Sequence, residues 1–121
     1  MPTNQQENEN ENYFLREQVK SLIGESVSAT PGRLSEILVE LSSFYATIAN
    51  KLEDILIFRA DRWMELRAGQ KSDTSTDRMW DSTPEGKDEL RFRSQLKYIE
   101  KSISSIKMRL RVKEVESFGR Y

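Results

Sequence analysis

The stretch LSEILVELSSFYATIANKLEDI, residues 34–55, decides the fold of this 121-residue chain. Its large apolar residues recur at alternating steps of four and three: Leu34, Leu38, Leu41, Tyr45, Ile48, Leu52 and Ile55. Such spacing keeps one apolar seam along a helix, as in coiled coils. Thr30 and Pro31 provide a cap and a first-turn proline, and Gly69 provides an end. The pattern therefore predicts one long helix over residues 31–68.

A second stretch, FRSQLKYIEKSISSIKMRL, residues 92–110, has the same pattern. Its seam positions are Phe92, Leu96, Ile99, Ile103, Ile106 and Leu110. Ser82-Thr83-Pro84-Glu85 is typical of a helix start, so we predict a second long helix over residues 84–117. A connection of about 15 residues lets the two helices lie antiparallel. The expected fold is all-α, a long antiparallel helical hairpin with a coiled-coil-like seam.

Three further segments precede or connect the two long helices. Residues 1–12 are acidic and of low complexity, which predicts a disordered tail. Residues 13–23 favour a short amphipathic helix that ends at Gly24, so residues 13–121 form a single helical domain. In the linker 70–82 we expect a helical turn that directs Met79 and Trp80 inward.

Composition excludes several classes of activity. The chain has no cysteine and no histidine, which rules out disulfides, thiolate nucleophiles, histidine bases and the usual structural zinc sites. Asp73, Asp77 and Asp81 recur every four residues, and we interpret them as turn-capping residues rather than as magnesium ligands. We expect no catalytic residue, metal or cofactor. Without a long apolar run or a signal peptide, the protein is expected to be cytoplasmic, with no membrane partner.

Charge is balanced overall but unevenly distributed. The chain has 19 basic and 20 acidic residues. Residues 1–58 hold four basic and nine acidic side chains, residues 59–93 hold eight of each, and residues 94–121 hold seven basic and three acidic. An acidic head and a basic tail favour head-to-tail contacts or anion binding.

The predicted helix 31–68 has more apolar surface than one neighbour covers. The additional flank consists of Ile37, Phe44, Leu56, Phe58 and Trp63. It is suited to the 13–23 helix, to another subunit or to a different protein, and patches of this kind are uncommon on monomers. We therefore expect self-association.

Basic and aromatic residues gather where the hairpin turns. Seven of them form the candidate nucleic-acid site: Arg59, Arg62, Trp63, Arg67, Lys71, Arg91 and Arg93. Arginine neutralises phosphate, and an indole gives a base a surface for stacking. The alternative is that the arginines pair with neighbouring acids and that Trp63 closes the core. Those acids are Asp61, Glu65, Asp88 and Glu89, of which Asp88 and Glu89 are expected on a solvated face.

The basic tail is a second candidate for binding anions. Its members are Lys107, Arg109, Arg111, Lys113 and Arg120, with Phe118 and Tyr121 beside them. The four cations between 107 and 113 do not share one face. The alternative is a helix C-terminus at which the helix dipole favours positive charge.

The order of these features resembles that of small helical bacteriophage proteins, most nearly the UvsY-like recombination mediators. The resemblance rests on Arg59-Ala-Asp-Arg62-Trp63 before Gly69, a polar loop, and Leu96-Lys97-Tyr98-Ile99-Glu100 in the second helix. It implies a phage-derived homo-oligomer that binds single-stranded DNA in the bacterial cytoplasm, with Arg59, Arg62 and Trp63 as contacts. The neutral middle and the single Trp63 depart from the family pattern.

Two functional hypotheses follow. The first is a non-enzymatic, oligomeric accessory protein that binds single-stranded nucleic acid. The second is a protein–protein interaction module, such as an adaptor, a host-factor inhibitor or a virion or assembly component, with no role for nucleic acid.

Overall fold

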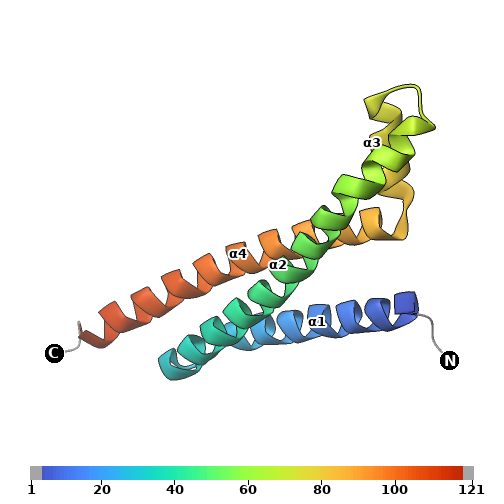
Figure 1. The fold of residues 1–121 in the computed structure, drawn as a ribbon. Helices are drawn as coiled ribbons and strands as arrows, with labels where there is room; N and C mark the ends of the chain where they lie inside the picture. Colours follow the sequence, from blue (N-terminus) through green and yellow to red (C-terminus); the bar gives the residue numbers. More distant parts are fainter. Residues whose placement is uncertain (1–3, 119–121) are drawn as a thin grey trace. The chain divides into compact units, whose positions relative to one another are not determined.

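The protein is all-α. A computed structural model describes residues 4–118, and no strand occurs within that range. The helices are α1 (Asn4–Ser26), α2 (Pro31–Ala68), α3 (Asp73–Ser82) and α4 (Pro84–Phe118) (Figure 1). No helix in residues 4–118 is both long and apolar enough to cross a membrane.

Caps predicted from the sequence begin the two long helices. The backbone N–H of Arg33 donates to Thr30 Oγ1 at 3.2 Å, and that of Gly86 donates to Thr83 Oγ1 at 3.0 Å. Each bond satisfies one of the amide groups that the first turn of a helix leaves unpaired. The helices run over 31–68 and 84–118, against predicted ranges of 31–68 and 84–117.

Residues 4–12 differ from the prediction of a disordered tail. They are helical and extend α1 from Asn4 to Ser26, beyond the predicted 13–23. Asn12 is buried on the same side of α1 as Leu15 and Val19, so the helix packs before the predicted start. Gly24, which was expected to end the helix, lies within it. Residues 1–3 of the predicted tail lie outside the described residues.

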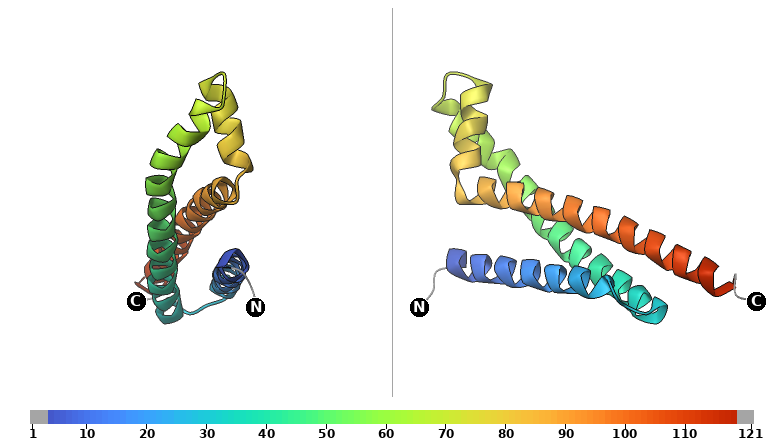
Figure 2. Two further views of the ribbon diagram at one scale, coloured as in Figure 1. Left: turned by 45° about the vertical axis from the view of Figure 1, so that its right-hand side comes forward. Right: turned by 180° about the vertical axis from the view of Figure 1, so that it is seen from behind.

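The chain divides into two compact units, and both long helices contribute to each. The first unit comprises Met1–Tyr45 and Tyr98–Tyr121, and the second comprises Ala46–Lys97. In the first unit α1 and α4 run in the same direction and α2 runs against them (Figures 1 and 2). In the second unit α3 lies beside the C-terminal part of α2 (Figure 2).

The predicted seams supply the core of both units. In the first unit the buried apolar residues include Leu34, Leu41, Ile99 and Ile106. In the second they include Ile48, Leu52 and Phe92. Every other seam position is at least half-buried. The heptad pattern therefore identified the inward face of both long helices.

The flank of α2 is covered in one unit and more open in the other. Ile37 is fully buried in the first unit, which also holds the buried Leu15, Val19 and Leu22 of α1. In the second unit Phe58 is exposed. The sequence left three possible partners for this flank: the 13–23 helix, another subunit or a different protein. The first of these lies in α1, which belongs to the same unit as the N-terminal part of α2.

Helix α3 replaces the single turn expected in the linker. Ser72 caps it, because Ser72 Oγ accepts a hydrogen bond from the Ser75 amide at 3.1 Å. Trp80 is fully buried, as predicted, but Met79 is exposed. The prediction that both point inward is wrong for Met79, because adjacent residues on a helix point about 100° apart.

Candidate nucleic-acid interface

All seven candidate residues lie in the second unit, on the C-terminal part of α2, the loop after it and the start of α4. They do not form one free basic patch. Arg59 and Arg93 belong to a polar network around a buried glutamate, and Arg62, Arg67 and Arg91 form exposed ion pairs. Trp63 is half-buried, and Lys71 is exposed.

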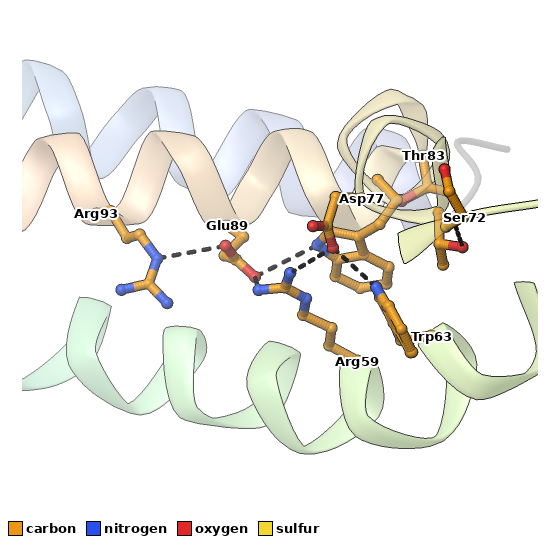
Figure 3. A network of polar contacts seen from close by, with 9 residues as sticks. Arg59, Trp63, Ser72, Asp77, Thr83, Glu89 and Arg93 are labelled. Atoms are coloured by element: carbon orange, nitrogen blue, oxygen red, sulfur yellow. Dashed lines mark hydrogen bonds and ion pairs between the residues drawn. The ribbon is translucent and has the colours of Figure 1, made fainter. Parts of the chain in front are cut away.

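The buried network is centred on Glu89. Glu89 Oε1 accepts hydrogen bonds from Arg59 Nη1 at 3.1 Å and from Trp80 Nε1 at 3.3 Å, and Oε2 accepts from Arg93 Nε at 3.3 Å (Figure 3). The Glu89 side chain is only 7 % exposed. A buried carboxylate requires such partners, because removing it from water is costly. Arg59 is therefore a structural partner of Glu89.

Trp80 contacts the same arginine. The Arg59 guanidinium carbon lies 5.7 Å from the centroid of the Trp80 ring, within range of a cation–π interaction. The Phe58 and Trp80 ring centroids are 6.2 Å apart, at an interplanar angle of 42°. The buried Trp80 indole therefore lies beside both the Phe58 ring and the Arg59 guanidinium.

Trp63 is held at its polar edge. Its Nε1 donates to Asp77 Oδ1 at 2.9 Å, and Arg59 Nη2 lies 3.6 Å from the same oxygen (Figure 3). Trp63 also borders a shallow depression of about 330 Å³ on the surface of the second unit. Its lining residues are Leu56, Arg59, Ala60, Trp63 and Asp77. The indole is half-buried, so part of it remains accessible.

The remaining arginines form exposed ion pairs. Arg62 Nη1 lies 2.6 Å from Glu65 Oε2, and Arg91 Nη1 lies 3.7 Å from Asp88 Oδ1. Arg67 Nε lies 2.8 Å from Asp73 Oδ1, and its Nη1 donates to the carbonyl of Gln70 at 2.7 Å. The side chains of Arg62, Arg67, Arg91 and Arg93 are between 38 % and 53 % exposed. Pairs of this kind contribute roughly 0–1 kcal/mol, so another anion can replace the carboxylate.

Lys71 lies in the loop between α2 and α3 and is exposed. Between residues 46 and 97 the chain has ten basic and ten acidic residues, so the second unit carries no net positive charge. Attraction of a polyanion would therefore depend on local rearrangement of ion pairs rather than on a long-range field.

Two of the three aspartates form ion pairs with arginines. Asp73 pairs with Arg67, and Asp77 with Arg59. Within residues 4–118 no group of three or more candidate ligands is placed to hold a metal ion.

The basic tail is partly engaged within the first unit. Arg109 Nη1 donates to Ser26 Oγ at 3.2 Å, and Lys113 Nζ donates to the carbonyl of Ala29 at 2.6 Å. Lys107 and Arg111 are exposed. Arg120 and Tyr121 lie outside the described residues, as does the side chain of Phe118.

Glu89 is the important residue that the sequence interpretation placed wrongly. It was expected on a solvated face, but it is buried. Glu89 precedes Phe92 by three residues and Arg59 follows Ile55 by four, so both continue the heptad seams. Extending each seam by one position would have predicted an ion pair inside the hairpin.

Comparison of the chain with protein-family models, with curated proteins and with solved structures found no match.

Proposed function

We propose that the chain is a non-enzymatic, self-associating helical protein that acts by binding other macromolecules through its outer faces. In this proposal α2 and α4 form an antiparallel hairpin with a coiled-coil-like seam. The observation that carries the proposal is the number of large apolar side chains that the cores leave exposed. The largest of these groups is on the helices of the first unit: Tyr13, Phe14, Val39, Tyr98, Met108, Val112 and Val115.

Their spacing distinguishes these residues from random surface positions. Met108, Val112 and Val115 follow steps of four and three, which place them on one face of α4. In the second unit Ile57 and Met64 are seven residues apart on α2, and both are more than 60 % exposed. Single exposed apolar residues are normal, but stripes of them are typical of protein interfaces.

Burying such side chains is favourable by about 25 cal/mol for each Å² of apolar surface removed from water. A second copy of the chain presents the same stripes, so self-association is the simplest way to gain this free energy. In solution the chain is therefore expected to exist as an oligomer.

Light scattering over a concentration series tests this proposal. The expected mass exceeds the 14.2 kDa of one chain and rises with concentration. A mass of 14.2 kDa at every concentration up to the solubility limit would overturn self-association.

We propose binding of single-stranded nucleic acid as a second candidate. The observation in its favour is that Arg62, Arg67 and Arg91 keep exposed side chains in weak ion pairs, and that Lys71 of the same unit is also exposed. Phosphate oxygens can exchange with the carboxylates, and the accessible part of Trp63 offers a stacking surface. This candidate agrees with the resemblance to UvsY-like mediators. That resemblance implies a phage protein that acts in the bacterial cytoplasm.

Fluorescence anisotropy of a labelled oligothymidylate at two salt concentrations tests the second candidate. We expect binding at low salt that weakens as salt rises, because bound phosphates release counterions. The variant Arg62→Glu/Arg91→Glu should lose this binding, whereas the matched control Arg16→Glu/Lys20→Glu on α1 should retain it. No salt-dependent binding, or equal loss in both variants, would contradict the candidate.

A further inference from the structure

Two outer faces of the first unit carry complementary residues. On α4, Lys101, Met108 and Val115 are spaced seven apart and lie opposite the buried Ile99 and Ile106. All three of these outer residues are exposed, Met108 by 68 % and Val115 by 65 %. The C-terminal half of α4 is therefore apolar on two sides, of which only one is in the core.

On α1 the outer face is acidic with an aromatic residue at its centre. Glu7 and Phe14 are seven residues apart, and Glu17 follows Phe14 by three. Phe14 is 60 % exposed, whereas its neighbour Leu15 is buried. Glu17 is exposed and forms only a long ion pair with Lys20, at 3.9 Å.

The two faces have opposite charge. Between residues 4 and 26 the chain has five acidic and two basic residues. Between residues 98 and 118 it has five basic and three acidic residues. Within one chain Arg109 and Lys113 bond to Ser26 and to the carbonyl of Ala29, so part of the positive charge is directed inward. Lys101 and Arg111 lie on the exposed side of the helix.

The spacings match when the two helices lie parallel. Seven residues of helix span about 10.5 Å on both elements. When Phe14 lies against Met108, Glu7 comes opposite Lys101, and Glu17 comes opposite Arg111. An apolar contact is then flanked by an ion pair on each side, which is the arrangement of a helical interface with a defined register.

One chain cannot make this contact with itself. α1 and α4 already belong to the same unit, and their outer faces are directed away from its core. Because α1 and α4 run in the same direction within the unit (Figure 2), a copy displaced without rotation presents its α1 parallel to the α4 of the first copy.

We propose that the outer face of α1 of one copy binds the outer face of α4 of the next copy, through Phe14 and Met108. This inference rests on the self-association proposed above and specifies its interface. The contact joins two different surfaces, so an open chain of copies leaves one α1 face and one α4 face free at its ends. Such a heterologous interface produces a ring or an open chain rather than a closed dimer.

Cysteine cross-linking tests the interface, because the chain has no native cysteine. The double variant Phe14→Cys/Met108→Cys should give a ladder of disulfide-linked multimers after mild oxidation, whereas either single variant should stop at dimers. Phe14→Cys/Val39→Cys is the matched control, since Val39 is equally exposed but lies on α2. A ladder no stronger than that of this control would overturn the inference.

Light scattering on the same samples distinguishes failure of the proposed interface from failure of self-association. Oligomers without the specific ladder would leave self-association intact and overturn the interface. A monomer of 14.2 kDa would overturn self-association itself. A cross-link formed only with another protein in a lysate would assign these faces to a different partner and would also overturn the inference.

Charge reversal provides a second, independent test. Glu7→Lys/Glu17→Lys and Lys101→Glu/Arg111→Glu should each weaken assembly about tenfold at low salt, because like charges then face each other. An equimolar mixture of the two variants should restore assembly, since both interfaces regain opposite charges. All four residues are exposed, so unchanged circular dichroism controls for folding. No recovery in the mixture would contradict the proposed pairing.

Discussion

The two units of this protein use the same heptad pattern in different ways. The first unit has a core of aliphatic residues contributed by α1, α2 and α4, with Leu34, Ile37, Leu41 and Ile99 fully buried. The second unit combines Ile48, Leu52 and Phe92 with a buried tryptophan and a buried glutamate. A charged pair at a seam position adds a requirement for register, because its bonds are satisfied in only one alignment. We expect the Arg59–Glu89 pair to favour one alignment of α2 with α4 within the second unit.

The largest expected effect comes from placing a charge in the apolar seam. Ile48 is 1 % exposed, so Ile48→Asp buries a carboxylate without a partner and should cost more than about 4 kcal/mol, enough to unfold the protein. Circular dichroism and thermal melting measure the loss. Val27→Asp is the control, because Val27 is 68 % exposed and lies in neither the seam nor the exposed stripes, so this variant should melt like the wild type. Native helicity in Ile48→Asp would show that the seam register is wrong.

Removing the carboxylate of the polar network should have the next largest effect. Glu89→Gln leaves Arg59 and Arg93 without their shared buried anion, and should lower the free energy of unfolding by about 2 kcal/mol. Urea denaturation measures this change. Glu65→Gln also removes the partner of an arginine, but an exposed one, and should change stability by less than about 0.5 kcal/mol. Equal effects of the two substitutions would remove the distinction between the network and the surface pairs.

Glycine-to-alanine substitutions should change stability in opposite directions in the two units. A Cβ at Gly86 would overlap the backbone carbonyl of Trp80, so Gly86→Ala should destabilise the protein by about 1–3 kcal/mol. Gly24 is helical and has open space around it, so Gly24→Ala should stabilise by about 0.5–1 kcal/mol. Differential scanning calorimetry of both variants gives the two signs. Stabilisation by Gly86→Ala would contradict the close approach of α3 and α4.

The smallest effect concerns an exposed hydrogen bond of the first unit. Tyr45 Oη donates to Glu100 Oε1 at 2.7 Å, and this bond raises the pKa of Tyr45 above its ordinary value. Because the pKa of Tyr45 is raised in the folded state, the stabilisation from this hydrogen bond is fully present below about pH 10. It is lost as pH rises through the pKa of Tyr45 in the folded protein. Ultraviolet titration of the tyrosinate band should show a late-titrating group that Glu100→Gln returns to an ordinary pKa. No difference between the two titrations would exclude the bond.

The fold was largely predictable, because long helices with heptad seams leave few alternatives. Thr30-Pro31 and Thr83-Pro84 could be identified as helix starts, because a hydroxyl cap and a first-turn proline favour a helix start through neighbouring residues alone. The helical start at Asn4 was not, because a polar and acidic segment without an apolar face gives no local signal for a helix.

The candidate site was less predictable than the fold. The sequence grouped Arg59 with Arg62 and Arg67 by their spacing on one helix, but a spacing does not indicate which carboxylates fold against it. Glu89 is on a different helix, 30 residues away, and Asp77 is on a third. Extending the heptad seam distinguishes Arg59, a seam position that pairs with Glu89, from Arg62, which pairs with Glu65 at the surface, but it does not indicate that Asp77 also pairs with Arg59.

Sedimentation equilibrium of the wild type beside Met108→Ser/Val112→Ser/Val115→Ser tests most directly whether the outer apolar residues serve assembly rather than folding. The predicted result is a wild-type mass that rises above 14.2 kDa with concentration and a variant that stays at the mass of one chain with unchanged helicity. Identical masses for both proteins at every concentration, or a variant that no longer folds, would contradict it.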